Sequence, residues 1–526
     1  MTHSRCLLIF ILAVSLAACG GGSAPPEPQA QPRLSISSAP IQEALSAGDE
    51  LVLKLEGRIS DAGTQQVFLQ LRDSGAAFAL PAIQAQAADK SIALNVISLP
   101  SLSAGQRSGR LELRACKDAA CAQPCDSAAA SLAYELNVSA VADWETHQRD
   151  ASHSGEVPIR LNPAKFSKAW EWKRPPGNEP IGGINPVVTK AGKVFVTTDV
   201  YFGDARLYAL KEVDGSEAWS QAMGSVPAFN PPAVGGRKVY AAVTGHSQTF
   251  LWAFDLETGQ FQHKSGFSGQ WPHFLAPTVF DDVAYAGGGY SGAEVYAFSG
   301  TDGSRKWAAT LGGSWDMFTP AVDARHVYQH NAHSLVLIDR LTGTELARIS
   351  DPAGNANGYS YHGAPMLGSR GNVIAFAGGA FSGRASANAE HYEQRKLSSF
   401  DIAGKKHEWS TADAYLTAPA VGRGVIYAAR NNPMALDALD EATGKRLWTW
   451  TASGTNDTSF HRNVVLTRTH LFVSTNSNVY AIDLTTRQSV WSYPAPGMLA
   501  ISADRTLYIA TGARESDGRL VAIRLK

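Results

Sequence analysis

The sequence predicts an all-β protein: an eight-bladed β-propeller preceded by a small immunoglobulin-like β-sandwich. Gly 48 and Pro 26 accompany 12 Trp and 16 Tyr, while only 18% of the residues are charged, which is typical of many short strands joined by tight turns. A strand pattern also recurs roughly every 45 residues from Asn185 onward, which is the spacing of a four-stranded blade. At 526 residues, the chain is too long for one ordinary core.

The charge balance argues against a nucleic-acid partner. Lys+Arg 46 stand against Asp+Glu 47, and no run of Lys or Arg forms a basic stripe. Because such a stripe neutralises phosphates in nucleic-acid-binding proteins, we expect no nucleic acid among the ligands.

Residues 1–18 are predicted to be a signal peptide. After Arg5, the apolar stretch that ends at Ala18 is too short to span a bilayer as a helix. It ends in Leu16-Ala17-Ala18-Cys19, which resembles the lipobox of bacterial lipoproteins. That resemblance implies that Cys19 becomes the acylated first residue of the mature protein and anchors it to a membrane; ordinary secretion with cleavage near Ala18 is the alternative.

The residue after Cys19 bears on localisation. Gly20 stands where the inner-membrane retention signal of lipoproteins would usually place Asp. The resemblance therefore implies an outer-membrane lipoprotein that faces the periplasm, with surface exposure as the alternative. Residues 19–33 are Gly- and Pro-rich and are predicted to form a flexible tether.

The sandwich is predicted over residues 34–140. About seven short segments alternate apolar and polar residues between turn-forming residues, as in Ile92-Ala93-Leu94 and Leu111-Glu112-Leu113. Cys116, Cys121 and Cys125 lie close together in a chain predicted to reach an oxidising compartment. We predict a Cys116–Cys121 disulfide with Cys125 left over, because a metal site would need a fourth ligand that no neighbouring His supplies.

Eight copies of the third-strand element define the propeller, predicted over residues 164–526. Most copies are followed by a Gly-containing turn, as at Thr258-Gly259 and Asp302-Gly303. An aromatic residue then begins the fourth strand and is predicted to pack blade against blade. The copies begin at Leu207, Leu251, Val295, Leu335, Leu397, Leu436, Val479 and Leu520. The position at which the fourth strand begins, which we call the aromatic slot, holds Trp219, His263, Trp307, Trp448 and Trp491. In one copy Ala347 leaves the slot vacant, and in another Trp409 lies one residue after it.

This pattern of Tyr-Ala-apolar-Asp, Thr-Gly and Trp resembles the tryptophan-docking repeats of the pyrroloquinoline-quinone-like propellers. That family includes quinoprotein dehydrogenases and a lipoprotein subunit of the outer-membrane barrel assembly machinery. The eighth copy lacks a fourth strand, and Trp170-Glu171-Trp172 precedes the first copy, so we predict that the two ends of the propeller share one blade. The connecting segment 141–163 includes Asp143–Asp150, which is predicted to pack across the propeller.

The first strands of a propeller line its central channel, which suggests a binding site. Aligning the copies on the Pro that opens each first strand predicts an aromatic and histidine funnel at one mouth of the channel, suited to a peptide or a flat ligand. The alternative is that these side chains simply fill the top of the channel. The predicted funnel residues are Phe229, Trp271, His273, Phe274, Trp315, Met317, Tyr361, His362, Tyr415, Phe460 and His461.

The sequence favours a protein-binding scaffold of the envelope over an enzyme. No catalytic residue and no metal ligand is predicted, because neither a Gly-x-Ser-x-Gly nor a His-Glu-x-x-His motif occurs and the funnel histidines are scattered over separate blades. The resemblance offers the alternative of a dehydrogenase with bound quinone and Ca²⁺, or a small-ligand-binding propeller. However, the adjacent Cys-Cys pair against which the alcohol-oxidising members stack the quinone is missing, so no cofactor is predicted.

Overall fold

The computed structural model describes residues 32–60, 66–82, 84–86, 91–176, 183–245, 249–269, 276–288, 294–311, 319–331, 333–354, 364–377, 395–511 and 518–526. The predicted signal peptide and Cys19 lie outside these residues. The described chain packs as two compact units. The first comprises the described residues up to Glu43, Leu51–Ser98 and Gln106–Leu136; the second comprises Ala44–Glu50, Leu99–Gly105 and Asn137–Lys526.

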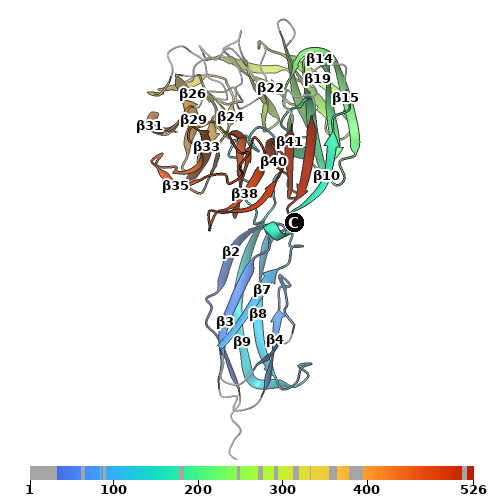
Figure 1. Cartoon of the computed structure of the whole chain (residues 1–526), viewed down its shortest axis with the longest axis vertical. Coiled ribbons are helices and arrows are strands. Elements are labelled where there is room, and N and C mark those ends of the chain that lie inside the picture. The colour runs from blue at the N-terminus through green and yellow to red at the C-terminus, as the bar shows by residue number, and fades with distance from the viewer. Residues whose placement is uncertain are drawn as a thin grey trace, which may run out of the picture. The chain divides into compact units, whose positions relative to one another are not determined.

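Two antiparallel sheets build the first unit (Figure 1). Their strands alternate buried and exposed residues, because each sheet has one face in the core. In β7, for example, Ile92, Leu94 and Val96 are buried and the residues between them are exposed. The rings of Phe78 and Tyr134, one from each sheet, meet edge to face at 5.1 Å. One sheet contains β1 (Arg33–Ile36), β3 (Val52–Ser60), β7 (Ser91–Ser98) and β5 (Phe78–Ala79); the other contains β2 (Ile41–Ser46), β9 (Pro124–Ser139), β8 (Gly105–Cys116), β4 (Val67–Asp73) and β6 (Gln84–Gln86).

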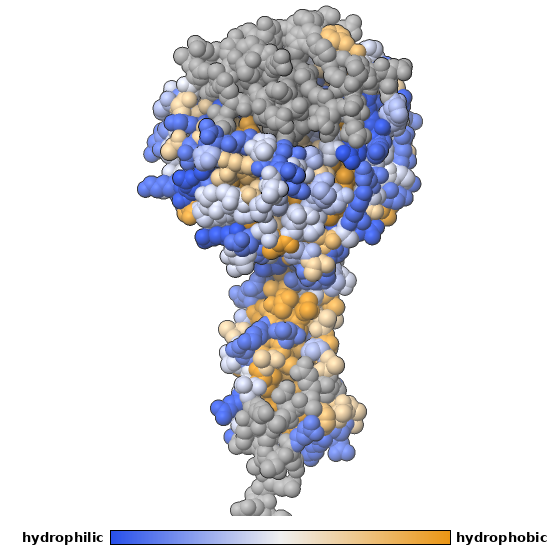
Figure 2. All heavy atoms as spheres, in the orientation of Figure 1, coloured by the Kyte–Doolittle hydropathy of each residue, from blue (hydrophilic) through white to orange (hydrophobic). Residues whose placement is uncertain are grey.

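The surface of this unit carries an apolar area. Val52 and Ile97 are paired across β3 and β7 and are 59% and 40% exposed, and Leu80 is 47% exposed. Figure 2 shows apolar residues gathered on this unit, whereas the described propeller surface in the same view is mostly hydrophilic or intermediate.

A disulfide joins Cys116 at the end of β8 to Cys121 in the following turn, with the Cα atoms 5.0 Å apart. The Asp118 carboxylate holds this turn by accepting the backbone N–H groups of Ala120, Ala122 and Gln123. Cys125 is half-buried and does not belong to this bridge.

We expect replacement of both bridged cysteines by Ser to destabilise the first unit by about 2 kcal/mol, because cross-linking a loop this short removes about that much chain entropy from the unfolded state. Hydrogen exchange of Leu111 and Leu113 in β8 would measure the loss. Cys125→Ser serves as the control, and equal protection in both variants would contradict the expectation.

The second unit consists of antiparallel sheets that follow one another along the chain (Figure 1). Among the described residues, six of these sheets have four strands and one has nine. The strand β10 (Ser167–Lys173), which follows the short 3-10 helix Pro163–Lys165, pairs with β42 (Arg519–Arg524) at the end of the chain. The predicted sharing of one sheet by the two ends of the propeller is thus present in this structure.

The strand bounds of the second unit are as follows. The nine-stranded sheet contains β11 (Gly183–Ile184), β12 (Val188–Lys190), β13 (Lys193–Asp199), β14 (Tyr201–Lys211), β15 (Glu217–Phe229), β16 (Ala233–Gly235), β17 (Lys238–Thr244), β18 (Phe250–Asp255) and β19 (Phe261–Gly266). The next two sheets, each with four strands, contain β20 (Thr278–Phe280), β21 (Val283–Gly287), β22 (Glu294–Ser299) and β23 (Arg305–Thr310), and then β24 (Ala321–Val322), β25 (His326–His330), β26 (Ser334–Asp339) and β27 (Glu345–Ser350). Two further four-stranded sheets contain β28 (Met366–Leu367), β29 (Asn372–Ala377), β30 (Lys396–Asp401) and β31 (Lys406–Ser410), and then β32 (Ala420–Gly422), β33 (Val425–Asn431), β34 (Met434–Asp440) and β35 (Arg446–Trp450). The last two contain β36 (Phe460–Leu466), β37 (His470–Thr475), β38 (Val479–Asp483) and β39 (Ser489–Tyr493), and then β40 (Met498–Ile501), β41 (Thr506–Thr511) and β42 with β10.

Neighbouring blades are joined by a contact that we call the clasp: a ring from the fourth strand of one blade rests on the Gly turn of the next. Trp219 is an example, since its indole N–H donates to the Leu256 carbonyl and its ring covers Gly259. A Cβ atom on this Gly would lie closer than 3.0 Å to the ring, and the φ of +70° also favours Gly. The same clasp joins Trp170 to Gly215, His263 to Gly303, Trp307 to Gly343 and Trp409 to Gly444.

The register of the strands corrects one detail of the sequence prediction. Trp409 pairs with Ser399 just as Trp307 pairs with Ala297, so Trp409 occupies the aromatic slot rather than a position one residue late. The slot at Ala347 is vacant, and in the following turn the positive φ falls on Lys405 instead of Gly404. The seam between the blades β24–β27 and β28–β31 therefore lacks the clasp.

We expect Gly259→Ala to destabilise the propeller by about 1–3 kcal/mol, because the methyl group both strains the backbone and displaces the Trp219 ring. Gly192→Ala is the matched control: Gly192 has a φ of +72°, but no atom lies within 4 Å of an added Cβ. Urea denaturation monitored by tryptophan fluorescence reports on the propeller alone, since all 12 Trp lie beyond residue 143. Equal losses in the two variants would show that the clasp does not contribute.

Candidate functional site: the plugged central channel

The connecting segment Trp144–Gly155 runs inside the propeller and binds its first strands, and we call it the plug. Its backbone carbonyls accept hydrogen bonds from N–H groups of six first strands around the ring, at 2.7 to 2.9 Å. The plug carbonyls thus pair with N–H groups that would otherwise need water as a partner. The plug therefore closes the central channel where it contacts the first strands. The pairs are Thr189 with Trp144, Val234 with Glu145, Val322 with Ala151, Leu367 with Ser152, Val421 with Ser154, and Leu466 with Gly155.

Plug side chains bind the carbonyls of the prolines that open the first strands. The Thr146 hydroxyl donates to the Pro277 carbonyl at 2.6 Å, and His153 Nδ1 lies 2.8 Å from the Pro365 carbonyl. Since a carbonyl only accepts, the proton of His153 is on Nδ1. The prolines used above to align the repeats are therefore also the inner contacts of the plug.

Gln148 is the most extensively bound plug side chain. Its amide nitrogen donates to the Pro419 carbonyl at 2.5 Å and to the Val464 carbonyl at 3.2 Å. Its amide oxygen accepts from Asn463 Nδ2 at 2.9 Å. The side chain is 3% exposed, so it ties two neighbouring blades together without help from solvent.

The two plug histidines are neutral. Their rings meet edge to face with centroids 5.3 Å apart. Burial lowers the pKa of His147 to about 3, with a further contribution from His153, and burial lowers the pKa of His153 to about 4. Neither ring carries charge near neutral pH, so the plug interior is uncharged at this point.

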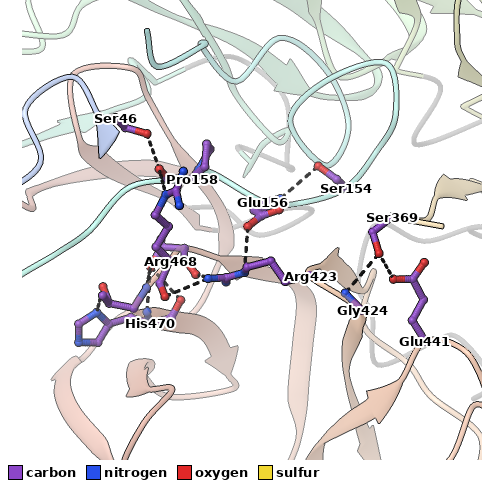
Figure 3. Close-up of polar contacts among 12 residues, drawn as sticks. Ser46, Ser154, Glu156, Pro158, Ser369, Arg423, Gly424, Glu441, Arg468 and His470 are labelled. Atoms are coloured by element: carbon purple, nitrogen blue, oxygen red, sulfur yellow. Dashed lines mark hydrogen bonds and ion pairs between the residues drawn. The ribbon is translucent and has the colours of Figure 1, made fainter. Parts of the chain in front are cut away.

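An ionic group holds the end of the plug (Figure 3). The Arg423 guanidinium lies 3.4 Å from Glu156 and donates to the Thr467 and Arg468 carbonyls. Arg468 in turn donates to the Pro158 carbonyl at 3.0 Å. Burial raises the pKa of Glu156, although Arg423 opposes that shift.

Three of the predicted funnel residues are buried. Phe229, Tyr415 and Phe460 are 2%, 2% and 0% exposed, because each belongs to a packed core of the blades. This burial corrects the prediction for these three, which present no surface to a ligand. Trp271, His273, Phe274, Trp315, Met317, Tyr361 and His362 lie outside the described residues, as does the side chain of His461, and for them the funnel stays a prediction.

A buried Ser, His and Asp group lies at the seam between the blades β24–β27 and β28–β31, and we call it the polar seam. Asp351 accepts from Ser398 Oγ at 3.0 Å through one oxygen, and His330 Nε2 lies 3.0 Å from the other. The serine therefore binds the carboxylate rather than the imidazole, which is not the arrangement that activates a nucleophile. All three residues are at most 5% exposed, so no substrate reaches them.

Metal-ligating side chains do not cluster in the described residues. Within them, no three His, Cys, Asp or Glu side chains gather where they could hold a metal. The space left beside the plug is about 20 Å³, far below the roughly 300–1,000 Å³ of typical small-molecule sites. No helix in the described residues is long and apolar enough to cross a membrane.

The inter-blade clasps and the plugged channel define a β-propeller of the pyrroloquinoline-quinone-like repeat class. The family described as "Outer membrane protein assembly factor BamB" matches residues 153–314, 267–450 and 419–526, so the chain belongs to this family. A crystal structure of BamB from Moraxella catarrhalis matches with a TM-score of 0.50 and 14% identity over 68% of this chain and 99% of that one, which shows a shared fold. A computationally designed protein, Ika8, matches with a TM-score of 0.47 and 10% identity over 68% and 99%. No curated protein sequence matches the chain.

Proposed function

We propose that this protein is a lipid-anchored binding scaffold of the bacterial cell envelope that acts with proteins assembling the outer membrane. Membership of the assembly-factor family over residues 153–526 is the observation that carries the proposal. In this proposal the propeller has eight blades, with the nine-stranded sheet counted as two, and the first unit is an immunoglobulin-like sandwich.

The plugged channel supports binding by the outside of the propeller. Because the plug occupies the inner strands, a partner has the two faces and the outer strands available. The fourth strands carry exposed apolar side chains, among them Leu346, Leu447 and Val490, which are 43%, 53% and 44% exposed. An outer strand has one unpaired edge, to which an extended partner segment can add.

Crosslinking in intact envelopes of the native host tests the scaffold. A photo-crosslinking residue at Leu346 or Leu447 is expected to capture a component of the outer-membrane assembly machinery, whereas one at Leu80 of the first unit is the comparison position. Deletion of the gene is expected to lower the amount of β-barrel proteins in the outer membrane. Unchanged barrel levels together with no assembly component captured at either propeller position would refute the proposal.

The lipid anchor has its own test. We expect Cys19→Ser to abolish incorporation of labelled palmitate and to move the protein from the membrane to the soluble fraction, because acyl chains supply most of the membrane affinity of such proteins. Cys125→Ser is the control and should retain the label. Labelled Cys19→Ser protein would contradict the lipobox interpretation while leaving the scaffold proposal standing.

A further inference from the structure

The plug does not fill the channel completely. A cavity of about 20 Å³ remains beside it, walled by Trp144, Thr146, His147 and Gln148 of the plug and by apolar residues such as Pro186 and Pro231 of the inner strands. A water molecule needs roughly 10–15 Å³ measured in this way. The cavity therefore has room for one or two waters and for no larger molecule.

Two plug side chains that line this cavity have polar atoms without a partner. Thr146 and Gln148 are hydrogen-bonded to proline carbonyls. Within the described chain, by contrast, neither the indole N–H of Trp144 nor either ring nitrogen of His147 has a hydrogen-bond partner. Both residues line the cavity.

The burial of the Trp144 indole makes this arrangement costly for a dry cavity. Trp144 is 3% exposed. A buried polar group without a partner costs about 1–3 kcal/mol, and native proteins usually remove that cost with an ordered water. The indole is a donor, and a neutral imidazole offers one donor and one acceptor.

We propose that this cavity is a binding site for ordered water that hydrogen-bonds to Trp144 and His147 and completes the contacts of the plug. The site lies inside the propeller and is separate from the partner surfaces of the proposed function. Water fits better than a cation, because apolar walls and two uncharged side chains supply neither charge nor enough ligands for one. It also fits better than an organic ligand, because the volume excludes one.

A crystal structure of the full chain at about 1.5 Å resolution tests the proposal, together with the double variant Trp144→Phe/His147→Leu, which keeps the apolar bulk and removes the polar atoms. We expect one or two ordered waters at hydrogen-bonding distance from these nitrogens in the wild type and none in the variant. An empty cavity in the wild type would overturn the proposal, and so would a metal ion identified by anomalous scattering.

Oxygen-17 relaxation in solution provides a second measurement, because it counts long-lived buried waters. The count is expected to fall by one or two in Trp144→Phe/His147→Leu, and an unchanged count would refute the site. Should the double variant not fold, Trp144→Phe alone removes one hydrogen bond while retaining the ring, and the wild-type crystal structure still decides the question.

Discussion

Replacement of Gln148 by Met is expected to lower the free energy of unfolding of the propeller by about 3 kcal/mol. Methionine has similar length but no amide, so the Pro419 and Val464 carbonyls and the Asn463 amide lose a partner in a buried site. Each buried polar group left unpaired costs about 1–3 kcal/mol. Urea denaturation followed by tryptophan fluorescence measures the loss.

Gln262→Met provides the matched control, because Gln262 lies on an exposed part of β19 and its amide binds only the nearby Gln260 carbonyl. Its stability should stay within about 0.5 kcal/mol of the wild type. If Gln148→Met were equally well tolerated, the plug would contribute little to the stability of the propeller.

The repeat made most of the propeller predictable. Most blades combine a Gly turn with an aromatic side chain that rests on it, so the same residue types recur at a fixed spacing. The terminal strand around Trp170 was predictable for the same reason, since it supplied the aromatic slot missing from the last copy and indeed pairs with β42.

The plug was harder to predict because it occurs once. Its residues bind backbone groups that every blade presents, so their side chains show no periodicity, and the composition of Asp143–Asp150 indicated only that the segment is packed. The funnel prediction failed at Phe229, Tyr415 and Phe460 because alternation along a strand does not distinguish a channel-facing side chain from one packed between blades. The polar seam was not predicted at all, since Asp351 and Ser398 lie far apart in sequence.

The vacancy at Ala347 gives the polar seam a specific role. At five other seams an aromatic side chain covers the next Gly turn, whereas here Asp351 of one blade binds Ser398 of the next and is held by His330. A buried hydrogen-bonded contact thus replaces a packed aromatic one. Removing one partner of such a contact leaves buried polar groups unpaired, and each of them costs about 1–3 kcal/mol.

Asp351→Leu is therefore expected to destabilise the propeller by about 2–4 kcal/mol, and the double variant His330→Leu/Asp351→Leu by clearly less, since it leaves no unpaired imidazole. Asp504→Leu is the control, because Asp504 is exposed and pairs with the exposed Lys526. Denaturation monitored by tryptophan fluorescence compares the three. A double variant as unstable as the single one would show that the lost packing, rather than an unpaired hydrogen-bonding group, sets the cost.

The pH dependence of stability separates the ionic contribution of the seam from its packing. Burial alone would raise the pKa of Asp351, but the hydrogen bonds and charge from His330, together with bonds from Ala353 and Ser398, outweigh burial and lower it. A carboxyl whose folded pKa lies below the unfolded value of about 3.9 stabilises the folded state above that pH, and the stabilisation disappears as pH falls through the folded pKa. The wild type should thus lose stability below about pH 4 more steeply than His330→Leu/Asp351→Leu does. Parallel curves for the two proteins would mean that the carboxylate is not stabilised by its partners, and the vacancy at Ala347 would then have to be compensated elsewhere in the ring.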